Sequence, residues 1–347
     1  MSEWNDPEIK NIFLNSTPLI DVRAPIEYED GSIPNSVNLP IMINSEREQV
    51  GTCYKVNGQA AAIKLGHELI SGEVKESRIS AWKNYITEHP KTEVFCFRGG
   101  LRSQISCQWL KEAGIERVPI TGGYKRMRRF FLSQINDKPL PGIVRLGGYT
   151  GSGKTKVLEQ IHNSIDLERL ASHRGSAFGE NGIQPGQIRF ENELGLELLK
   201  KAEKMIIVED ESSMIGKLRI PQRLYLSMGE SSIIILKTDI ETRVSTIFDE
   251  YVENTDFLSL SSCLQRISKS LGGQLYKEIS SEMNLAFRKD KSVNNHEAWI
   301  MMLLKSYYDP LYEKAIRRQA GKVIFEGSQK EVIDFSNKFL RSAESAI

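Results

Sequence analysis

The sequence has few cysteines, almost no net charge and no long apolar run. Its four cysteines, at positions 53, 96, 107 and 263, lack paired spacing, which argues against a disulfide framework or a zinc site and favours a reduced, cytosolic protein. The 46 basic residues nearly balance the 45 acidic ones, so bulk charge does not indicate a nucleic-acid partner. No segment approaches the roughly 20 apolar residues of a membrane span, and the first residues lack the order of a signal peptide. We therefore expect a cytoplasmic protein without membrane association.

The domain organisation follows from where prolines and glycine interrupt the pattern. The 347 residues, 40% hydrophobic and 26% charged, are typical of a globular chain long enough for two domains. Two prolines and a glycine in 137–142 predict a linker. We expect an α/β domain over 1–136, a second α/β domain over 143–240, and a mainly helical region over 241–347 that packs on the second domain.

The apolar patterns predict the fold class of both domains. Short apolar runs predict strands at 18–23, 92–97, 117–124, 142–148, 204–210 and 231–238. Helical spacing predicts helices at 59–70, 78–89 and 102–114, and another over 156–165. Strands that alternate with helices indicate mainly parallel sheets.

The stretch GYTGSGKT (148–155) has the spacing of a phosphate-binding P-loop. It follows an apolar strand and precedes a predicted helix, which is the context this motif needs. Its glycines let backbone N–H groups converge on an oxyanion, its lysine reaches the outer phosphate, and its threonine is a candidate magnesium ligand. The predicted phosphate-binding residues are Gly148, Gly151, Ser152, Gly153, Lys154 and Thr155.

Two further stretches of the second domain are weaker candidates. Glu209 or Asp210, at the end of a predicted strand, suits a Walker-B-like position near a metal or a water, although a strand that runs into a polar loop would look the same. Arg174, in SHRGSAFG (172–179), is a candidate second phosphate ligand.

The stretch FCFRGGLRS (95–103) predicts a reactive cysteine. Cys96 ends a predicted strand, and Arg98 and Arg102 flank two glycines before the next helix. Backbone N–H groups and two arginines would lower the thiol pKa and hold an anion beside the thiolate. Cys107, inside the helix among apolar neighbours, fits a structural role instead.

The spacing Cys-x5-Arg-Ser also occurs in cysteine-dependent phosphatases. Phe95 stands where such phosphatases usually place a histidine, and a P-loop domain has no evident place in a simple phosphatase. We therefore favour a different use of the same loop.

LIDVRAPIEYEDGSIPNSVNLP (19–40) resembles the N-terminal signature of rhodanese domains, with Ser32 in place of the more usual histidine, and TGGYKRMRRF (121–130) resembles their closing motif. These two motifs, the cysteine loop, the P-loop and SHRGSAFG occur together in one chain. In this combination the chain resembles the tRNA 2-selenouridine synthase family, in which a rhodanese domain is fused to a P-loop domain.

The resemblance implies a reaction at the wobble 2-thiouridine of certain tRNAs. A geranyl group from geranyl diphosphate is first added to the sulfur, and selenophosphate then supplies the selenium that displaces it. The resemblance makes Cys96 the essential cysteine and the 148–155 loop the phosphate site. Our hypothesis is that Cys96 either carries selenium as a perselenide or assists its transfer. It also implies a partner that supplies selenophosphate. We expect no firmly bound cofactor, with magnesium as the candidate ion.

A basic run beside the linker is a candidate tRNA contact. YKRMRRF (124–130) carries Lys125, Arg126, Arg128 and Arg129, which suit phosphate binding, although a solvated helix face has the same pattern. Three alternative functions remain open: a rhodanese-type sulfurtransferase with an ATP-dependent P-loop domain, a P-loop kinase or ATPase with a regulatory rhodanese module, and an RNA-binding scaffold.

Overall fold

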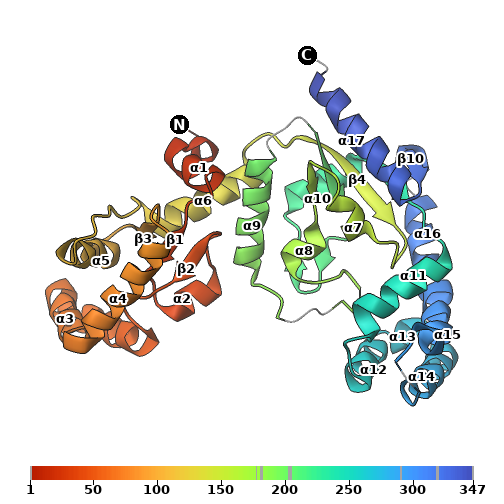
Figure 1. The fold of residues 1–347 in the computed structure, drawn as a ribbon, viewed down its shortest axis with the longest axis horizontal. Helices are drawn as coiled ribbons and strands as arrows, with labels where there is room; N and C mark the ends of the chain where they lie inside the picture. Colours follow the sequence, from red (N-terminus) through yellow and green to blue (C-terminus); the bar gives the residue numbers. More distant parts are fainter. Residues whose placement is uncertain are drawn as a thin grey trace. The chain divides into compact units, whose positions relative to one another are not determined.

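The structure is a computed structural model that describes residues 2–176, 178–179, 183–201, 205–289, 291–317 and 320–345. The chain forms two compact units (Figure 1). Unit 1 comprises Met1–Pro139 and Gly186–Lys200, and unit 2 comprises Leu140–Pro185 and Lys201–Ile347. Within the described residues, no helix is both long and apolar enough to span a membrane.

Unit 1 is built on a parallel three-stranded sheet of order β2-β1-β3. Its strands are β1 (Leu19–Asp21), β2 (Ser36–Asn38) and β3 (Glu93–Phe95). Its helices are η1 (Glu3–Asn5), α1 (Pro7–Leu14), α2 (Pro25–Asp30), α3 (Asn44–Leu69), α4 (Gly72–Glu88), α5 (Leu101–Glu112), α6 (Gly123–Asn136) and α9 (Gln187–Lys200).

The two faces of this sheet belong to different cores, because successive strand residues point to opposite sides. Phe95 joins a core with α1, α6 and α9. Val94 and Cys96 join the opposite core with α4 and α5. Strand alternation therefore places the cysteine on the face that α5 covers.

Helix α9 belongs to unit 1, although its sequence lies far beyond the other elements of that unit. It packs along α6, so closely that a Cβ on Gly195 would lie 2.8 Å from the carbonyl oxygen of Phe131. Arg128 of α6 forms an ion pair with Glu191 of α9, and Asn192 donates a hydrogen bond to the carbonyl of Ser32 at 2.7 Å. The sequence patterns did not anticipate this insertion.

Unit 2 contains a five-stranded parallel sheet of order β10-β9-β4-β6-β5 and a small antiparallel pair, β7-β8. Its strands are β4 (Gly142–Gly148), β5 (Ser164–Ile165), β6 (Met205–Glu209), β7 (Met214–Ile215), β8 (Leu218–Arg219), β9 (Ser232–Leu236) and β10 (Val323–Gly327). Its helices are α7 (Lys154–Leu158), α8 (Leu167–Ala171), α10 (Gln222–Glu230), α11 (Ile240–Ile247), η2 (Phe248–Val252), α12 (Phe257–Arg266), α13 (Ser268–Leu271), α14 (Gly273–Phe287), α15 (Val293–Leu303), η3 (Leu304–Tyr308), α16 (Asp309–Arg317), η4 (Ala320–Lys322) and α17 (Gln329–Ser345).

The central strand of the unit 2 sheet is β4, which leads directly into the P-loop. Apolar residues of α7 and α17 pack with those of β4, β6 and β9 in one core. A second core holds the helices from α11 to η3 together. The carboxyl ends of β4 and β6, where the predicted phosphate and acidic residues lie, are neighbours.

The fold class predicted from the sequence is confirmed, and most predicted strands lie where the structure has them. The strand predicted at 117–124 is wrong: only an isolated bridge joins Pro119 to Val94, because proline lacks an N–H donor and Gly122 turns the chain into α6 with a φ of 80°. The helix predicted over 156–165 is also wrong in extent, since α7 ends at Leu158 and β5 follows. The region after residue 240 is mainly helical, but it also supplies β10 to the sheet edge.

Candidate functional site

The thiol of Cys96 lies in a loop of tightly turned backbone at the start of α5. Its Sγ is 3.2 Å from the Ser103 hydroxyl and 3.8 Å from the carbonyl oxygen of Gly100. Burial opposes ionisation of the thiol. Hydrogen bonds from the Ser103 hydroxyl and from the amides of Ser103 and Arg98, with the charge of Arg102, outweigh it and lower the pKa of Cys96. The loop therefore stabilises the thiolate form of Cys96 relative to an ordinary cysteine.

The cysteine inside α5 has the opposite character. Cys107 is buried in the apolar core beside the sheet, and burial raises its pKa to about 11. The two thiols, eleven residues apart in the chain, thus differ in reactivity because only Cys96 has hydrogen-bond donors aimed at its sulfur.

Removing one of these donors tests the origin of the depressed pKa. In a Ser103→Ala variant the pKa of Cys96 should rise, because the hydroxyl stabilises the thiolate. The pH profile for alkylation of Cys96, followed by peptide mass analysis, should shift to higher pH, while that of Cys53 stays unchanged as an internal reference. An unshifted profile would assign the low pKa to the backbone amides and Arg102 alone.

Gly123, at the start of α6, holds the cysteine loop in place. Gly123 has a φ of 52°, and a Cβ there would lie 2.1 Å from the carbonyl oxygen of Cys96. We expect backbone strain in Gly123→Ala to destabilise unit 1 by about 1–3 kcal/mol or more. The measurement is the melting temperature, which should fall. Gly100→Ala is the matched control, since a Cβ at Gly100 meets nothing within 4 Å. Equal melting temperatures for the two variants would contradict this account.

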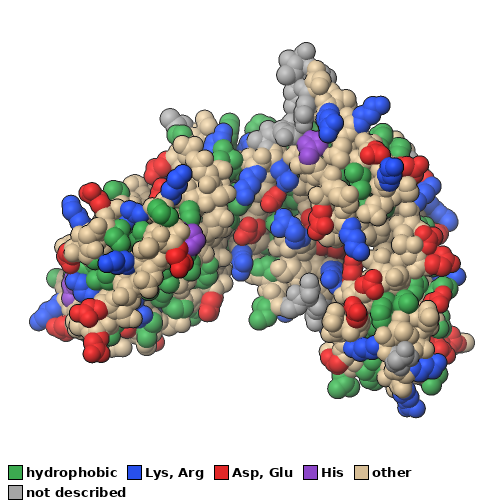
Figure 2. All heavy atoms as spheres, in the orientation of Figure 1, with side chains coloured by type: hydrophobic (Ala, Val, Ile, Leu, Met, Phe, Trp, Pro, Cys, Tyr) green, Lys and Arg blue, Asp and Glu red, His purple; other side chains and the backbone are tan. Residues whose placement is uncertain are grey.

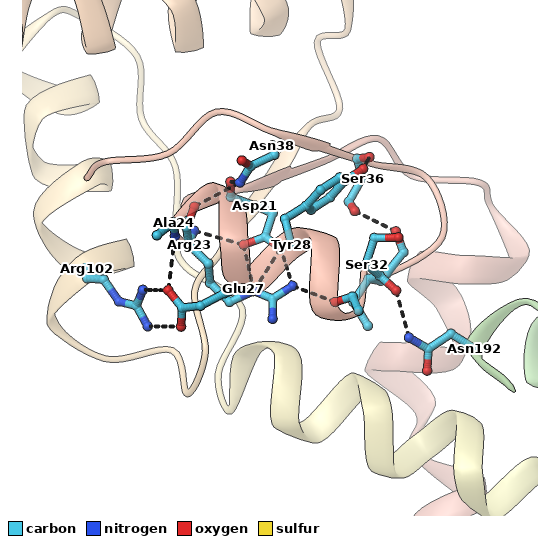
Figure 3. Close-up of polar contacts among 12 residues, drawn as sticks. Asp21, Arg23, Ala24, Glu27, Tyr28, Ser32, Ser36, Asn38, Arg102 and Asn192 are labelled. Atoms are coloured by element: carbon cyan, nitrogen blue, oxygen red, sulfur yellow. Dashed lines mark hydrogen bonds and ion pairs between the residues drawn. The ribbon is translucent and has the colours of Figure 1, made fainter. Parts of the chain in front are cut away.

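The predicted arginines of the loop behave differently from each other. Arg102 is held in a bidentate ion pair by Glu27, with Nη–Oε distances of 2.5 and 3.1 Å (Figure 3). Burial disfavours the Glu27 carboxylate, but Arg102, the Ala24 amide and Arg47 lower its pKa. The Arg98 side chain is exposed and lies over the Phe97 ring, 5.8 Å from its centre. Arg98 lowers the pKa of Cys96 through its backbone amide.

A buried network anchors the same region (Figure 3). Arg23 pairs with Asp21 at 2.6 Å and donates to the carbonyl of Gly31 at 2.9 Å. Asn38 donates to the carbonyls of Asp21 and Arg23. Residues of the rhodanese-like signature at 19–40 therefore hold the sheet and α2 together. Glu27, from the same signature, connects them to the cysteine loop.

The P-loop has the backbone that its glycines predict. Gly151 and Gly153 have φ of 78° and 83°, in the region that favours glycine, and a Cβ on Gly148 would lie 2.7 Å from Ser152 Oγ. Lys154 begins α7, with Thr155 next to it, and donates to the carbonyl of Gly148 at 3.4 Å. The six predicted residues form one continuous turn at the end of β4.

A cluster of three glutamates lies in front of Lys154. Carboxylate oxygens of Glu168, Glu209 and Glu211 lie within 4.8 Å of one another. Burial and mutual repulsion raise the pKa of Glu168 to about 8 and of Glu211 to about 7, and raise that of Glu209 strongly. Burial disfavours the Lys154 ammonium, but the surrounding carboxylates, Glu209 foremost, raise its pKa.

The two Walker-B candidates are separated by the structure. Glu209 is fully buried, and its Oε2 accepts a hydrogen bond from the Glu168 amide at 3.2 Å. Its Oε1 has no hydrogen-bond partner among the described residues. Asp210 instead forms an ion pair with buried Arg145 at 2.7 Å. Glu209 therefore faces the lysine and the glutamates, and Asp210 is part of the sheet's support.

The loop that carries Arg174 borders the same cluster. A Cβ on Gly175 would lie 2.3 Å from Glu168 Oε1 and 2.9 Å from Glu211 Oε1. Arg174 donates to the carbonyl of Glu250, and its guanidinium lies 5.0 Å from the centre of the Tyr251 ring. The backbone of this stretch therefore lies against Glu168 and Glu211 at Gly175. Ala177 of the same stretch lies outside the described residues.

The structure does not arrange the basic run of α6 as one free cationic stripe. Arg126 pairs with Asp6 and Glu8 at 2.7 Å, and Arg129 with Glu3 at 3.2 Å. Arg128 pairs with Glu191, as described above, and Lys125 lies 5.5 Å from the centre of the Phe97 ring. The three arginines thus pair with carboxylates of unit 1, and tRNA binding by these four residues stays a prediction.

Two family models match this chain, one over each half. The family model described as the tRNA 2-selenouridine synthase AAA domain matches residues 141–343, and that of the rhodanese-like domain matches residues 7–128. The chain belongs to the tRNA 2-selenouridine synthase family. The resemblance inferred from the motifs is thereby confirmed, and the protein is an enzyme of this family.

Several known tRNA 2-selenouridine synthases match this chain along nearly its whole length. A tRNA 2-selenouridine synthase from Shewanella sp. (strain MR-4) is 42% identical over 95% of this chain and 92% of its own. Those from Marinobacter nauticus and Sulfurovum sp. (strain NBC37-1) are 41% and 42% identical over 94% and 96% of this chain, and over 95% and 98% of their own.

Four side chains of the two candidate sites were not identified from the sequence of this synthase. Glu27 stood in the quoted rhodanese signature, so a signal for it existed. Ser103 was the last residue of the cysteine stretch, and Glu211 follows the Walker-B candidates by one position. Glu168 lies in DLERL, which has no motif, and only the fold brings it to Lys154.

Proposed function

We propose that this enzyme converts the wobble 2-thiouridine of tRNA to 2-selenouridine through an S-geranyl-2-thiouridine intermediate. The observation that carries the proposal is the combination, in one chain of this family, of a thiolate-stabilising cysteine loop and a P-loop with an adjoining carboxylate cluster. The named relatives are tRNA 2-selenouridine synthases over almost their full length. The substrates imply activity in the cytoplasm, together with an enzyme that supplies selenophosphate.

The first step uses unit 2. The sulfur of 2-thiouridine attacks C1 of geranyl diphosphate, so that an S–C bond forms, the C–O bond breaks and diphosphate leaves. The base releases its N3 proton to solvent. We assign the diphosphate to the P-loop amides and Lys154, which stabilise negative charge as it develops on the leaving group. Arg174 is the further cation that we assign to the same anion.

Divalent metal would complete this site. Three carboxylates that share a small buried space repel each other, and a magnesium ion bound by oxygen ligands relieves that repulsion. The buried Oε1 of Glu209, without a partner among the described residues, fits such a ligand, with Glu168, Glu211 and Thr155 as the other candidates. When bound, the ion would supply positive charge to the leaving diphosphate.

The second step uses unit 1. Selenium from selenophosphate attacks C2 of the S-geranyl base, so that a C–Se bond forms, the C–S bond breaks and geranylthiolate leaves. Water then cleaves the P–Se bond to release phosphate. We assign the selenium donor to the Cys96 loop, where the amides, Arg98 and Arg102 suit an anion and the thiolate assists the transfer.

Adding one donor at a time tests the proposal. Purified protein and 2-thiouridine tRNA should yield S-geranyl-2-thiouridine with geranyl diphosphate and magnesium, and 2-selenouridine when selenophosphate is also present, by mass analysis of nucleosides. Chelation of magnesium with EDTA should slow geranylation of 2-thiouridine tRNA, whereas selenation of preformed S-geranyl-2-thiouridine tRNA should remain. No mass change with either donor would overturn the proposal, and ATP turnover without donors would favour a P-loop ATPase instead.

A further inference from the structure

A large cavity lies in unit 1 beside the cysteine loop. Its volume is about 1070 Å³, close to the upper end of the range for ligand sites in proteins. Phe97, Leu101 and Arg102, all from the loop or its helix, form part of its wall. The cavity therefore lies next to the Cys96 loop, to which we assign the selenium donor.

The remaining wall is largely apolar. Ile41, Met42, Val50, Ile63, Ile105 and Trp109 contribute hydrocarbon or ring surface from α3, α5 and the segment before α3. The polar part of the lining holds both signs of charge: Arg47, which pairs with Glu27 at 3.3 Å, and Lys55, together with Asp30 and Glu48. A small anion such as selenophosphate needs neither this volume nor these walls, because its recognition depends on N–H donors and cations.

Helix α3 makes little use of its apolar residues for the core. Its 26 residues are all described, and Ala62 is its one buried side chain. Tyr54, which lines the cavity, is 57% exposed, and Leu101 of α5 is 44% exposed. Figure 2 shows hydrophobic side chains reaching the surface among charged ones over the region of α3 to α5. Apolar surface left open beside a functional loop indicates a ligand that covers it.

We propose that this cavity binds the geranyl chain of S-geranyl-2-thiouridine while the C2 atom of the base lies at the Cys96 loop. This inference rests on the proposed function and adds to it the place where the alkylated base is held. The apolar wall takes the isoprenoid chain, and Lys55 suits a phosphate beside the modified nucleoside. The chain that leaves with the sulfur thus also serves to position the base for selenation.

A matched pair of substitutions on α3 tests this assignment. Val50 lines the cavity and is half-buried, whereas Val56 is 74% exposed and does not line it. With tRNA that carries preformed S-geranyl-2-thiouridine, we expect Val50→Trp to slow selenation at least about tenfold, because the indole occupies the space of the chain. Val56→Trp should stay within about twofold of wild type. With tRNA that carries S-methyl-2-thiouridine, the three proteins should react equally.

Selenation of the geranyl substrate by Val50→Trp at the wild-type rate would overturn the assignment. So would an equal loss on both substrates, which would reflect damage to the fold. Ile63→Asp, in the part of α3 after Gly58, provides a second variant with the same expectation if Val50→Trp does not fold. If wild type leaves the geranylated tRNA unchanged, the proposed function is wrong. Binding of the S-geranyl-2-thiouridine nucleoside to wild type but not to Val50→Trp, followed by tryptophan fluorescence, then still decides the cavity assignment.

Discussion

Replacing Lys154 with alanine should reduce the rate of geranylation by about 100- to 1000-fold, the usual effect of removing a group that stabilises charge in the transition state. The lysine lies at the turn between β4 and α7, and the surrounding carboxylates keep it charged. The measurement is the rate of S-geranyl-2-thiouridine formation at saturating geranyl diphosphate. Selenation of preformed S-geranyl-2-thiouridine tRNA should remain.

Lys156→Ala is the matched control, because Lys156 lies on the same helix and is exposed. It should keep wild-type geranylation. A Lys154→Ala variant that retains geranylation and loses only nucleotide hydrolysis would contradict the diphosphate assignment and would indicate that the P-loop serves a nucleotide.

Replacing Cys96 with serine should slow selenation at least about 1000-fold, because a neutral hydroxyl cannot supply the thiolate that assists selenium transfer in this loop. Geranylation should continue, so the variant should accumulate S-geranyl-2-thiouridine when both donors are present. Mass analysis of the nucleosides distinguishes this outcome from a general loss of activity.

The control for that variant is Cys53→Ser, which changes a half-buried thiol of α3 that is not part of the loop. It should produce 2-selenouridine at the wild-type rate. Selenation by Cys96→Ser at the normal rate would remove the catalytic role of the cysteine and leave the loop as an anion site only.

Local patterns predicted the parts of the fold that local chemistry decides. The strand at 142–148 and the P-loop after it are continuous in sequence, and the structure has β4 with these bounds. The helix over 102–114 was predicted from its spacing and its glycine, and Gly114 indeed follows α5 with a φ of 85°. Apolar periodicity and turn residues suffice where the determining contacts lie within a few positions.

The errors arose where distant partners decide the structure. The residues over 44–58 were assigned to no element, yet they form the first part of α3, because this segment has exposed side chains and no apolar face to reveal it. β10 joins the sheet edge through pairing with β9, although some ninety residues separate them. No short window of sequence contains such pairing information.

The candidate sites show the same division. Cys96 and the P-loop lysine were identified from motifs, since their chemistry depends on adjacent backbone. The role of Glu27 as the partner of Arg102 depends on a contact between residues 75 positions apart. The glutamate cluster likewise required Glu168 and Glu209 to meet across the β5–β6 region, which only the folded sheet provides.

The insertion of α9 into unit 1 has a consequence for synthesis on the ribosome. Unit 1 is complete only when Lys200 has been added, although its other elements end by Pro139. At about 5–20 residues per second, translation of the intervening segment takes roughly 3–12 s. During that interval the nascent chain carries α6 without the helix that covers Phe131 and its neighbours. A fragment that stops at residue 139 would keep this apolar surface permanently, so expression of the rhodanese half alone should favour aggregation or chaperone capture.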